Sequence, residues 1–539
     1  YAVSAYVLVG EPGLGRDFFV QLFEILLTFA PLLLLRAAPY ERGWISIARR
    51  YTGLVGVWLN RSPIALERAM LGLTLIVAAL LRLLKLGDIA SASSSNTSAV
   101  SILKAVSGEL RLFITDPQGL NGPFDAIQSF LIQVFGPSPF VVLLPSAILG
   151  TLTVFVIYLL TAEIVRQGGL PGARSIGVLA ALLAATSRWH VSLSRSGMEV
   201  VLLPLLLVTA IYWLLLAFRI SARPDATRAN QILRGTGRLS PNTWKVLALT
   251  AGCGICTGLA CDLAPGLWLV PLLVVGFLIA WRWRAPQSFE RLRLGLATLA
   301  GAALLSASPI IWSYLSQLVG FPAGSYVLAH SSKPIPAGPG IFTLGFWSQV
   351  GVNLGSALSL IVSQDFSAGY PAVGGAPIIP TLLGPFLALG LLVLIWRWRS
   401  MAALAVGLLI ALPLVASVAV GAPIALIEAA SVLPVLCILP ALGIYQLALW
   451  LGRLPIALDR INGVRVFTTP EQIGRLALFV FLLASAIRTF FWYFEATLPS
   501  SPANQFTPSF IGEQLARLPV ALPLSQAVLR LLLTAPHLL

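Results

Sequence analysis

Residues 139–160 read PFVVLLPSAILGTLTVFVIYLL, a run of 22 residues without a charged side chain. A helix needs about 20 mainly apolar residues to cross the hydrocarbon core of a bilayer. Similar apolar runs lie on both sides of this one. Together they predict an all-α integral membrane protein with about 12 transmembrane helices, near 18–35, 65–84, 139–160, 175–187, 197–218, 246–262, 264–281, 295–317, 379–396, 402–421, 430–450 and 476–493.

The composition excludes a soluble protein. Of the 539 residues, 58% are hydrophobic and only 10% are charged, whereas about a quarter of the residues are charged in soluble domains. The formal net charge is +15. The basic residues fall mostly in short loops between apolar runs, so we expect no nucleic-acid partner. Because the chain begins with Tyr1 rather than Met, we expect it to come from a longer or processed polypeptide.

The basic loops predict the orientation of the bundle. Short loops rich in Lys and Arg mark the cytoplasmic side of a membrane protein. If the spans simply alternate in direction, the basic segments all fall on one side. These are 41–64, 219–245, 282–294 and 452–475, together with Arg397 and Arg399. We therefore expect a multi-pass protein of the inner (plasma) membrane, with these segments in the cytoplasm.

The same topology divides the chain into three parts. Residues 1–64 would form an additional transmembrane helix and a basic cytoplasmic segment at the interface, 65–493 the main bundle, and 494–539 an amphipathic tail outside. Two long loops, 86–138 and 318–378, fall on the outer face and contain short amphipathic stretches such as 97–106 and 345–362. Loops of this length are usually functional, so we expect the functional site on the outer face.

Three short motifs within the bundle favour structural roles. The Trp-Arg-Trp-Arg repeats at 281–284 and 396–399 end apolar spans, where Trp and Arg commonly anchor a helix at the bilayer surface. The Gly-x-x-x-Gly pattern at 254–258 predicts close helix packing. Cys253 and Cys256 form a C-x-x-C inside a span, and we expect buried thiols there and no metal site.

Four motifs carry a resemblance to a known family. They are Phe-Gly-Pro-Ser-Pro-Phe at 135–140, Leu-Pro-Ser-Ala-Ile-Leu-Gly-Thr at 144–151, Trp-His-Val at 189–191 and Ser-Arg-Ser-Gly at 194–197. In this order they resemble the GT-C membrane glycosyltransferases, and more narrowly the bacterial protein-mannosyltransferase and aminoarabinose-transferase branch (glycosyltransferase families 39 and 83). The likeness is strongest over 65–220 and continues loosely to about 450.

The resemblance implies a chemistry that this sequence does not fully support. In that family a polyprenyl-phosphate sugar enters from the bilayer, and an Asp-Glu pair in the first outer loop acts on the acceptor. Read without gaps, Asn96-Thr97 stands at that place here. A side-chain amide has no basic oxygen near neutral pH, so it cannot accept the proton of the incoming hydroxyl. Leu143 likewise stands where the family often has Arg.

Other residues are candidates for the missing roles. Carboxylates of the outer loops could replace the lost acid, although two of them also fit turn and cap positions. Arg195 could contact a lipid phosphate or anchor the helix at the interface, and His190 could make a structural hydrogen bond. The fallback acids are Asp116, Asp125 and Asp365, and the candidate lipid or phosphate ligands are Arg195, His190 and Gln364. No metal site is expected, although Asp365 could have a ligand or metal role.

We therefore favour a GT-C-fold membrane protein that has lost glycosyl transfer and serves as a scaffold or lipid-binding subunit of a membrane complex. Membrane lipids and other integral membrane subunits are the expected partners. The first alternative is an active glycosyltransferase that uses a polyprenyl-phosphate sugar as its donor. The second is a transporter, although no inverted repeat of broken helices is visible in the sequence.

Overall fold

The computed structural model describes the central part of the chain, and its descriptions cover residues 63–84, 123–136, 139–195, 199–222, 241–261, 266–290, 292–308, 383–420 and 426–453, with a few single positions. The expected spans at 18–35 and 476–493 and the expected tail 494–539 lie outside these residues. The same holds for the amphipathic stretch 97–106.

Each of the ten expected spans within the described part overlaps a helix, and no strand occurs among the described residues. The expectation of an all-α membrane protein is confirmed. The ten helices are α4 (Pro63–Leu83), α7 (Pro139–Gln167), α8 (Ala173–Thr186), α10 (Leu202–Ser221), α11 (Pro241–Ala260), α12 (Gly266–Arg284), α14 (Arg293–Ser306), α18 (Gly384–Trp396), α19 (Met401–Val420) and α20 (Leu426–Arg453).

Four shorter elements were not expected from the apolar runs: α6 (Pro123–Phe135), α9 (Arg188–Arg195), the 3-10 turn η2 (Glu199–Val201) and α13 (Pro286–Glu290). The helix α6 lies in the first expected outer loop. The helix α9 follows α8 after a bend of 60° at a short break, where Ser187 has an extended backbone. This bend turns the chain into the region of the candidate site.

Length and composition identify three described helices that could cross a membrane: 140–167, 199–221 and 242–260. The number is four if α8 and α9 form one bent span, and four shorter apolar helices accompany them. Helices of 10 to 17 residues can still contribute to a bundle when neighbouring helices cover their ends.

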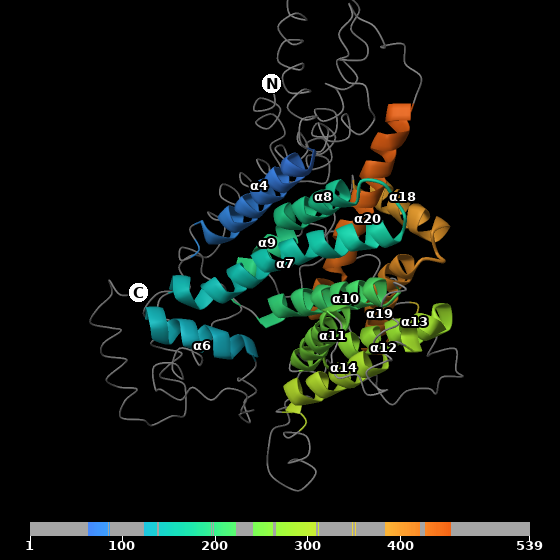
Figure 1. Cartoon of the computed structure of the whole chain (residues 1–539). Helices are drawn as coiled ribbons and strands as arrows, with labels where there is room; N and C mark the ends of the chain where they lie inside the picture. The colour runs from blue at the N-terminus through green and yellow to red at the C-terminus, as the bar shows by residue number, and fades with distance from the viewer. Residues whose placement is uncertain are drawn as a thin grey trace, which may run out of the picture.

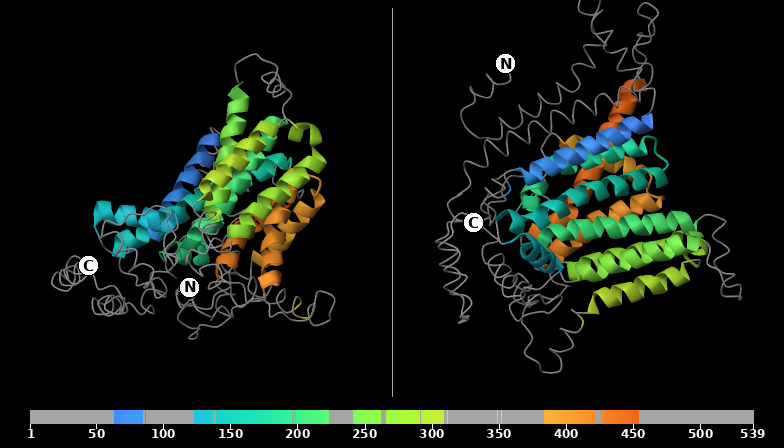
Figure 2. Two further views of the ribbon diagram at one scale, coloured as in Figure 1. Left: turned by 90° about the horizontal axis from the view of Figure 1, so that it is seen from below. Right: turned by 60° about the vertical axis from the view of Figure 1, so that its left-hand side comes forward.

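The helices α4, α7, α10, α11 and α14 contact one another in this order. The right-hand view of Figure 2 shows them as one row of roughly parallel rods, from α4 in blue to α14 in yellow-green. The helices α8 and α20 pack against this row and against each other, and α18 packs against α20 (Figure 1). The core of the bundle lies between these two groups.

Glycines allow two of these contacts to be close. Gly254 and Gly258 of α11 face the backbone of α14, where a Cβ atom would collide with the carbonyl oxygens of Leu299 and Ala303. The close packing predicted from the Gly-x-x-x-Gly pattern is thus confirmed. Gly390 of α18 meets the backbone of α20 in the same way. Close backbone approach is a common means of association between helices in membranes.

Side-chain contacts identify which helix ends lie together. Arg284 donates to the Ser400 carbonyl oxygen (3.0 Å) and Arg397 donates to the Gly168 carbonyl oxygen (2.8 Å). Arg219 pairs with Glu163 (3.0 Å). The ends of α10, α12 and α18 that carry these arginines therefore lie together with the end of α7 at one end of the bundle, which we call the basic end. This agrees with the simple alternation of direction on which the expected topology depends.

Candidate functional site: a buried cationic cluster

The structure places only some of the candidate residues. His190 and Arg195 belong to α9, and Asp125 belongs to the first turn of α6. The remaining candidates, Asn96, Thr97, Asp116, Gln364 and Asp365, lie outside the described residues. Their roles stay predictions.

Arg82 lies at the centre of the site and is completely buried. It comes from the last turn of α4, and its guanidinium donates to five groups. Nε donates to Ser194 Oγ (3.2 Å), Nη1 to the carbonyl oxygens of Ala78 (2.9 Å) and Ala185 (3.2 Å), and Nη2 to the Ala184 carbonyl oxygen (3.4 Å) and to His190 Nδ1 (2.7 Å). An arginine has five N–H donors, so the protein uses all of them, and every acceptor is uncharged.

The contact with Arg82 determines the tautomer of His190. Because a guanidinium can only donate, Nδ1 of His190 accepts this hydrogen bond and Nε2 carries the proton of the neutral ring. Nδ1 also lies 3.2 Å from the Ala184 carbonyl oxygen, which accepts from Arg82 instead. The Nε2–H group is buried and finds no acceptor among the described residues. The expected structural hydrogen bond of His190 is therefore present.

Arg195 caps α4. Its Nη1 donates to the carbonyl oxygens of Leu81 (2.9 Å) and Arg82 (3.1 Å). The last carbonyl groups of a helix have no partner within the helix, and a cation there is favoured by the helix dipole. Only 1% of Arg195 is exposed, so the expectation of an anchor at the membrane interface is wrong. The proposed contact of Arg195 with a lipid phosphate stays a prediction.

Two motifs that carried the sequence resemblance lie against each other at this site. Ser146 Oγ lies 3.0 Å from the Ser194 carbonyl oxygen and accepts a hydrogen bond from the Gly197 N–H (3.2 Å). Gly150 faces Ser194 so closely that a Cβ atom would collide with its side chain. Gly197 has φ of 70°, a conformation that favours glycine. The motifs at 144–151 and 194–197 thus join α7 to the chain around α9.

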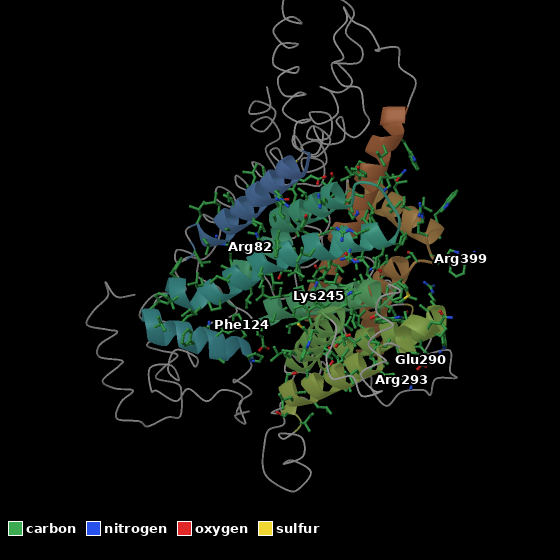
Figure 3. The ribbon with its side chains drawn as sticks, viewed as in Figure 1. Arg82, Phe124, Lys245, Glu290, Arg293 and Arg399 are labelled. Carbon is green, nitrogen blue, oxygen red and sulfur yellow. The ribbon has the colours of Figure 1, made fainter. Side chains whose placement is uncertain are left out.

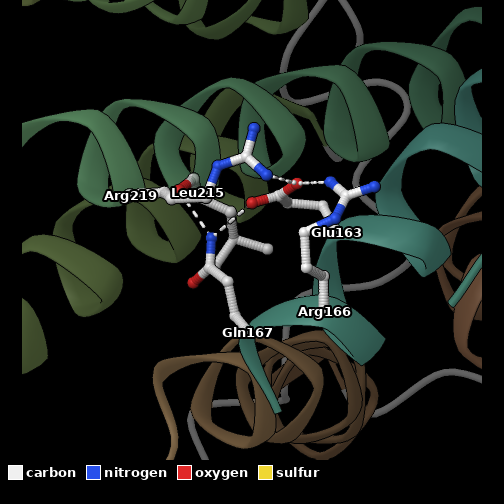
Figure 4. Close-up of polar contacts among 5 residues, drawn as sticks. All are labelled: Glu163, Arg166, Gln167, Leu215 and Arg219. Carbon is white, nitrogen blue, oxygen red and sulfur yellow. Dashed lines mark hydrogen bonds and ion pairs between the residues drawn. The ribbon is translucent and has the colours of Figure 1, made fainter. Parts of the chain in front are cut away.

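A second buried polar cluster lies at the basic end and includes a carboxylate (Figure 4). Glu163 of α7 is buried and pairs with Arg166 (2.6 Å) and with Arg219 of α10 (3.0 Å). Gln167 donates to Glu163 Oε1 (2.9 Å) and to the Leu215 carbonyl oxygen (2.7 Å). Because both oxygens of Glu163 have cationic or amide donors, this cluster joins α7 to α10.

Sequence reasoning missed both Arg82 and Glu163, although a signal for each was present. An ionisable residue within an apolar run is a functional or structural candidate by default, because an unpaired charge is costly in a membrane. Arg82 lies in the expected span 65–84, and Glu163 follows the expected span 139–160 by three residues. What the sequence could not show was that Arg82 meets residues of α8 and α9 more than 100 positions away.

The described cluster is suited to hold helices together rather than to transfer protons. The guanidinium groups of Arg82 and Arg195 remain protonated near neutral pH, so neither of these two residues can serve as a base. Within the residues that the structure describes, no group of three His, Cys, Asp or Glu side chains could hold a metal ion. Asp125 is the one fallback acid whose backbone is described, in α6, which packs against α7.

No family model matches the chain, and no curated protein matches it. Among solved structures, the chain is similar to an archaeal oligosaccharyltransferase and to ArnT. The archaeal oligosaccharyltransferase AglB from Archaeoglobus fulgidus, in complex with an inhibitory peptide and a dolichol-phosphate, is 15% identical over 85% of this chain, with a TM-score of 0.48. This chain spans only 61% of that oligosaccharyltransferase.

A second similar structure is ArnT from Cupriavidus metallidurans bound to undecaprenyl phosphate, which is 16% identical over 84% of this chain and 81% of its own, with a TM-score of 0.49. ArnT in the apo state gives the same TM-score at 14% identity. At such identities and TM-scores the likeness supports no conclusion about the activity of this chain.

Proposed function

We propose that this GT-C-like membrane protein has lost glycosyl transfer and serves as a scaffold or lipid-binding subunit of a membrane complex. The observation that carries the proposal is the use made of the motif residues. Ser146, Gly150, His190, Ser194 and Arg195 contact one another or Arg82 and join the ends of α4, α7 and α9. Residues that hold helices together would be retained in a protein that keeps this fold but no longer catalyses sugar transfer.

Three of the described acidic side chains also favour this reading. Sugar transfer to a hydroxyl needs a carboxylate that can accept a proton. Glu163 is paired with two arginines, Glu67 accepts a hydrogen bond from Ser175 (3.0 Å) and Glu290 pairs with Arg293. The contacts of Glu163 and Glu67 join helix ends at the basic end, away from Arg82. At the family's acidic pair, the sequence offers Asn96-Thr97.

The proposal includes a location and a division of the chain. We place the protein in the inner (plasma) membrane, with the basic end in the cytoplasm and the loops 86–138 and 318–378 outside. The segments 1–64 and 494–539 would dock other integral membrane subunits, because they extend beyond the bundle that the family resemblance covers. Positive residues on the cytoplasmic side are the general rule for such proteins.

The direct test is a transfer assay on the full chain. The purified protein would be placed in nanodiscs with a radiolabelled undecaprenyl-phosphate sugar, since undecaprenyl phosphate is the lipid bound in the similar ArnT structure. An active polyprenyl-phosphate-sugar transferase in the same nanodiscs is the positive control. We expect neither transfer nor hydrolysis of the sugar. Turnover that is lost in Asp116→Asn, Asp125→Asn or Asp365→Asn would identify an active glycosyltransferase and reject the proposal.

A second experiment separates the scaffold from the lipid-binding role. Purification of the chain from its own membranes in mild detergent should yield stoichiometric membrane subunits if it is a scaffold. A lone chain that retains undecaprenyl phosphate in native mass spectrometry would instead support the lipid-binding role. A chain that purifies with neither membrane subunits nor undecaprenyl phosphate would contradict both the scaffold role and the lipid-binding role.

A further inference from the structure

The two Trp-Arg-Trp-Arg repeats come together in the folded chain. The repeat at 281–284 ends α12, and the repeat at 396–399 begins at the last residue of α18. They are more than 100 residues apart in the sequence, yet Arg284 donates to the carbonyl oxygen of Ser400, the residue that follows the second repeat (3.0 Å). The helices α12 and α19, which carry or follow the two repeats in the sequence, are in contact.

The four tryptophans of these repeats divide into one inward and three outward side chains. Trp281 is buried, donates to Ser288 Oγ (2.8 Å) and lies edge-on to Phe218, with ring centroids 5.1 Å apart. Trp283, Trp396 and Trp398 are 80%, 87% and 59% exposed. Trp281 therefore fixes the first repeat to the core, while three indoles remain available to the surroundings of the bundle.

The four arginines carry a positive charge that nothing described neutralises. Arg284 and Arg397 use one Nη atom each for a carbonyl oxygen of the chain. Arg282 and Arg399 are exposed and form no hydrogen bond or ion pair with any described residue, although Arg399 lies over the Trp398 ring (5.4 Å). No ion pair to any of the four is present within the described part of the chain. Figure 3 shows Arg399 at the far end of the bundle from Phe124.

We infer that the two repeats form one binding site for the headgroup of an anionic phospholipid in the leaflet at the basic end. Arginine forks bind phosphate oxygens in a bidentate manner, and exposed indoles lie at the depth of the headgroups. Positive groups at a membrane surface attract anionic lipids, on the order of 1 kcal/mol for each Lys or Arg. The charge complementarity selects a lipid as the occupant. The site lies apart from the Arg82 cluster and does not depend on the proposed function.

The test removes charge from the repeats while it keeps the hydrogen bonds of Arg284 and Arg397 to the protein. The variant Arg282→Gln/Arg399→Gln leaves Arg284 and Arg397 in place. The matched control is Arg68→Gln/Lys245→Gln, which removes two exposed charges at the same end from α4 and α11. Delipidated full-length protein would be titrated with phosphatidylglycerol and, separately, phosphatidylcholine, and the first bound lipid quantified by native mass spectrometry.

We expect the wild type and the control to prefer phosphatidylglycerol over phosphatidylcholine. The repeat variant should bind phosphatidylglycerol about 25-fold more weakly, since each of its two arginines contributes roughly fivefold. Arg282→Lys/Arg399→Lys should restore most of the affinity, and the thermal unfolding midpoint shows that each variant folds. Equal losses in variant and control, or no headgroup preference in the wild type, would overturn the inference. So would a stoichiometric membrane protein that leaves with Trp283→Ala/Trp396→Ala while lipid binding stays unchanged.

Discussion

Arg82 shows how a single side chain can join three segments of a membrane bundle. Its donors reach its own helix, the end of α8 and the side chains of α9. A buried acceptor left without a donor costs about 1–3 kcal/mol, so the five contacts depend on one another. Removing the guanidinium exposes several carbonyl oxygens to an apolar interior at once.

Arg82→Met is therefore expected to destabilise the protein by at least about 3 kcal/mol, because at least three buried acceptors lose their donor. The stability of Arg82→Lys, which has three donors in place of five, should fall between that of the wild type and that of Arg82→Met. Arg68→Met is the matched control, because Arg68 lies exposed on the same helix. Thermal unfolding in detergent, followed by size-exclusion chromatography, measures the effect. Equal midpoints for Arg82→Met and Arg68→Met would contradict the structure.

Glu163 and Glu290 offer a comparison of two carboxylates that each pair with an arginine three residues further on. The Glu163 side chain is 2% exposed and also pairs with Arg219, whereas the Glu290 side chain is 44% exposed. Glu163→Gln should cost about 2 kcal/mol, because it leaves two arginines without a buried counter-charge. Glu290→Gln should cost no more than about 0.5 kcal/mol.

The measurement is the denaturant-induced unfolding of both variants in the same detergent. If Glu290→Gln were the more damaging of the two, the assignment of Glu163 as the joint between α7 and α10 would be wrong.

Single residues of the site were only partly predictable. The motif at 194–197 pointed to Arg195, but its role as the cap of α4 requires the fold that brings Leu81 beside it. An arginine near an apolar run fits an anchor at the interface and a buried cap equally well in sequence. Only the position of its acceptors distinguishes them. The outer-loop acids Asp116 and Asp365 lie beyond the described residues, so their roles stay predictions.

At the scale of the helix, the contact between α11 and α14 depends on the absence of side chains at Gly254 and Gly258. In a membrane, helices gain little from burying apolar surface, and close van der Waals contact takes over that role. The contact between α18 and α20 is built in the same way at Gly390. Small residues at these positions set how near the helices can come.

Gly254→Ala should separate α11 from α14 and destabilise the protein by about 1–3 kcal/mol, as overpacking does in other cores. The control is Gly301→Ala on α14, where a Cβ atom would meet nothing within 4 Å. This second change should be neutral or stabilising by up to about 1 kcal/mol, because alanine favours a helix. The measurement is the unfolding midpoint of each variant. A lower midpoint for Gly301→Ala than for Gly254→Ala would contradict the close packing of α11 against α14.

Helices were the part of the fold that the sequence predicted best. Apolar length is a strong signal, and all ten described spans matched a helix. The break between α8 and α9 was not foreseen, because residues 178–196 contain no proline or glycine. Its cause lies in the tertiary contacts of Arg82 and Ser146 with α9, which a local pattern cannot reveal.

At the scale of the whole molecule, alternation of the helices places the basic ends of α7, α10, α12 and α18 together. A cysteine-free variant with Arg399→Cys or Arg174→Cys should react with a membrane-impermeant maleimide only in inverted vesicles. Phe135→Cys, at the end of α6, should react only from the opposite side; its side chain is 66% exposed. Mass spectrometry of the labelled protein reads the result. Labelling of positions 399 and 135 from the same side would refute the topology.

The burial of Arg82 also has an electrical consequence. Its acceptors are all neutral, so its positive charge, like that of the buried Arg195, stays fixed among α4, α8 and α9. In a medium of low dielectric constant, such a charge raises the local potential and repels other cations. A stationary guanidinium is one means by which water-filled pores refuse protons and metal ions. A group that approaches this end of α4 would therefore meet a positive potential, which favours anions over cations.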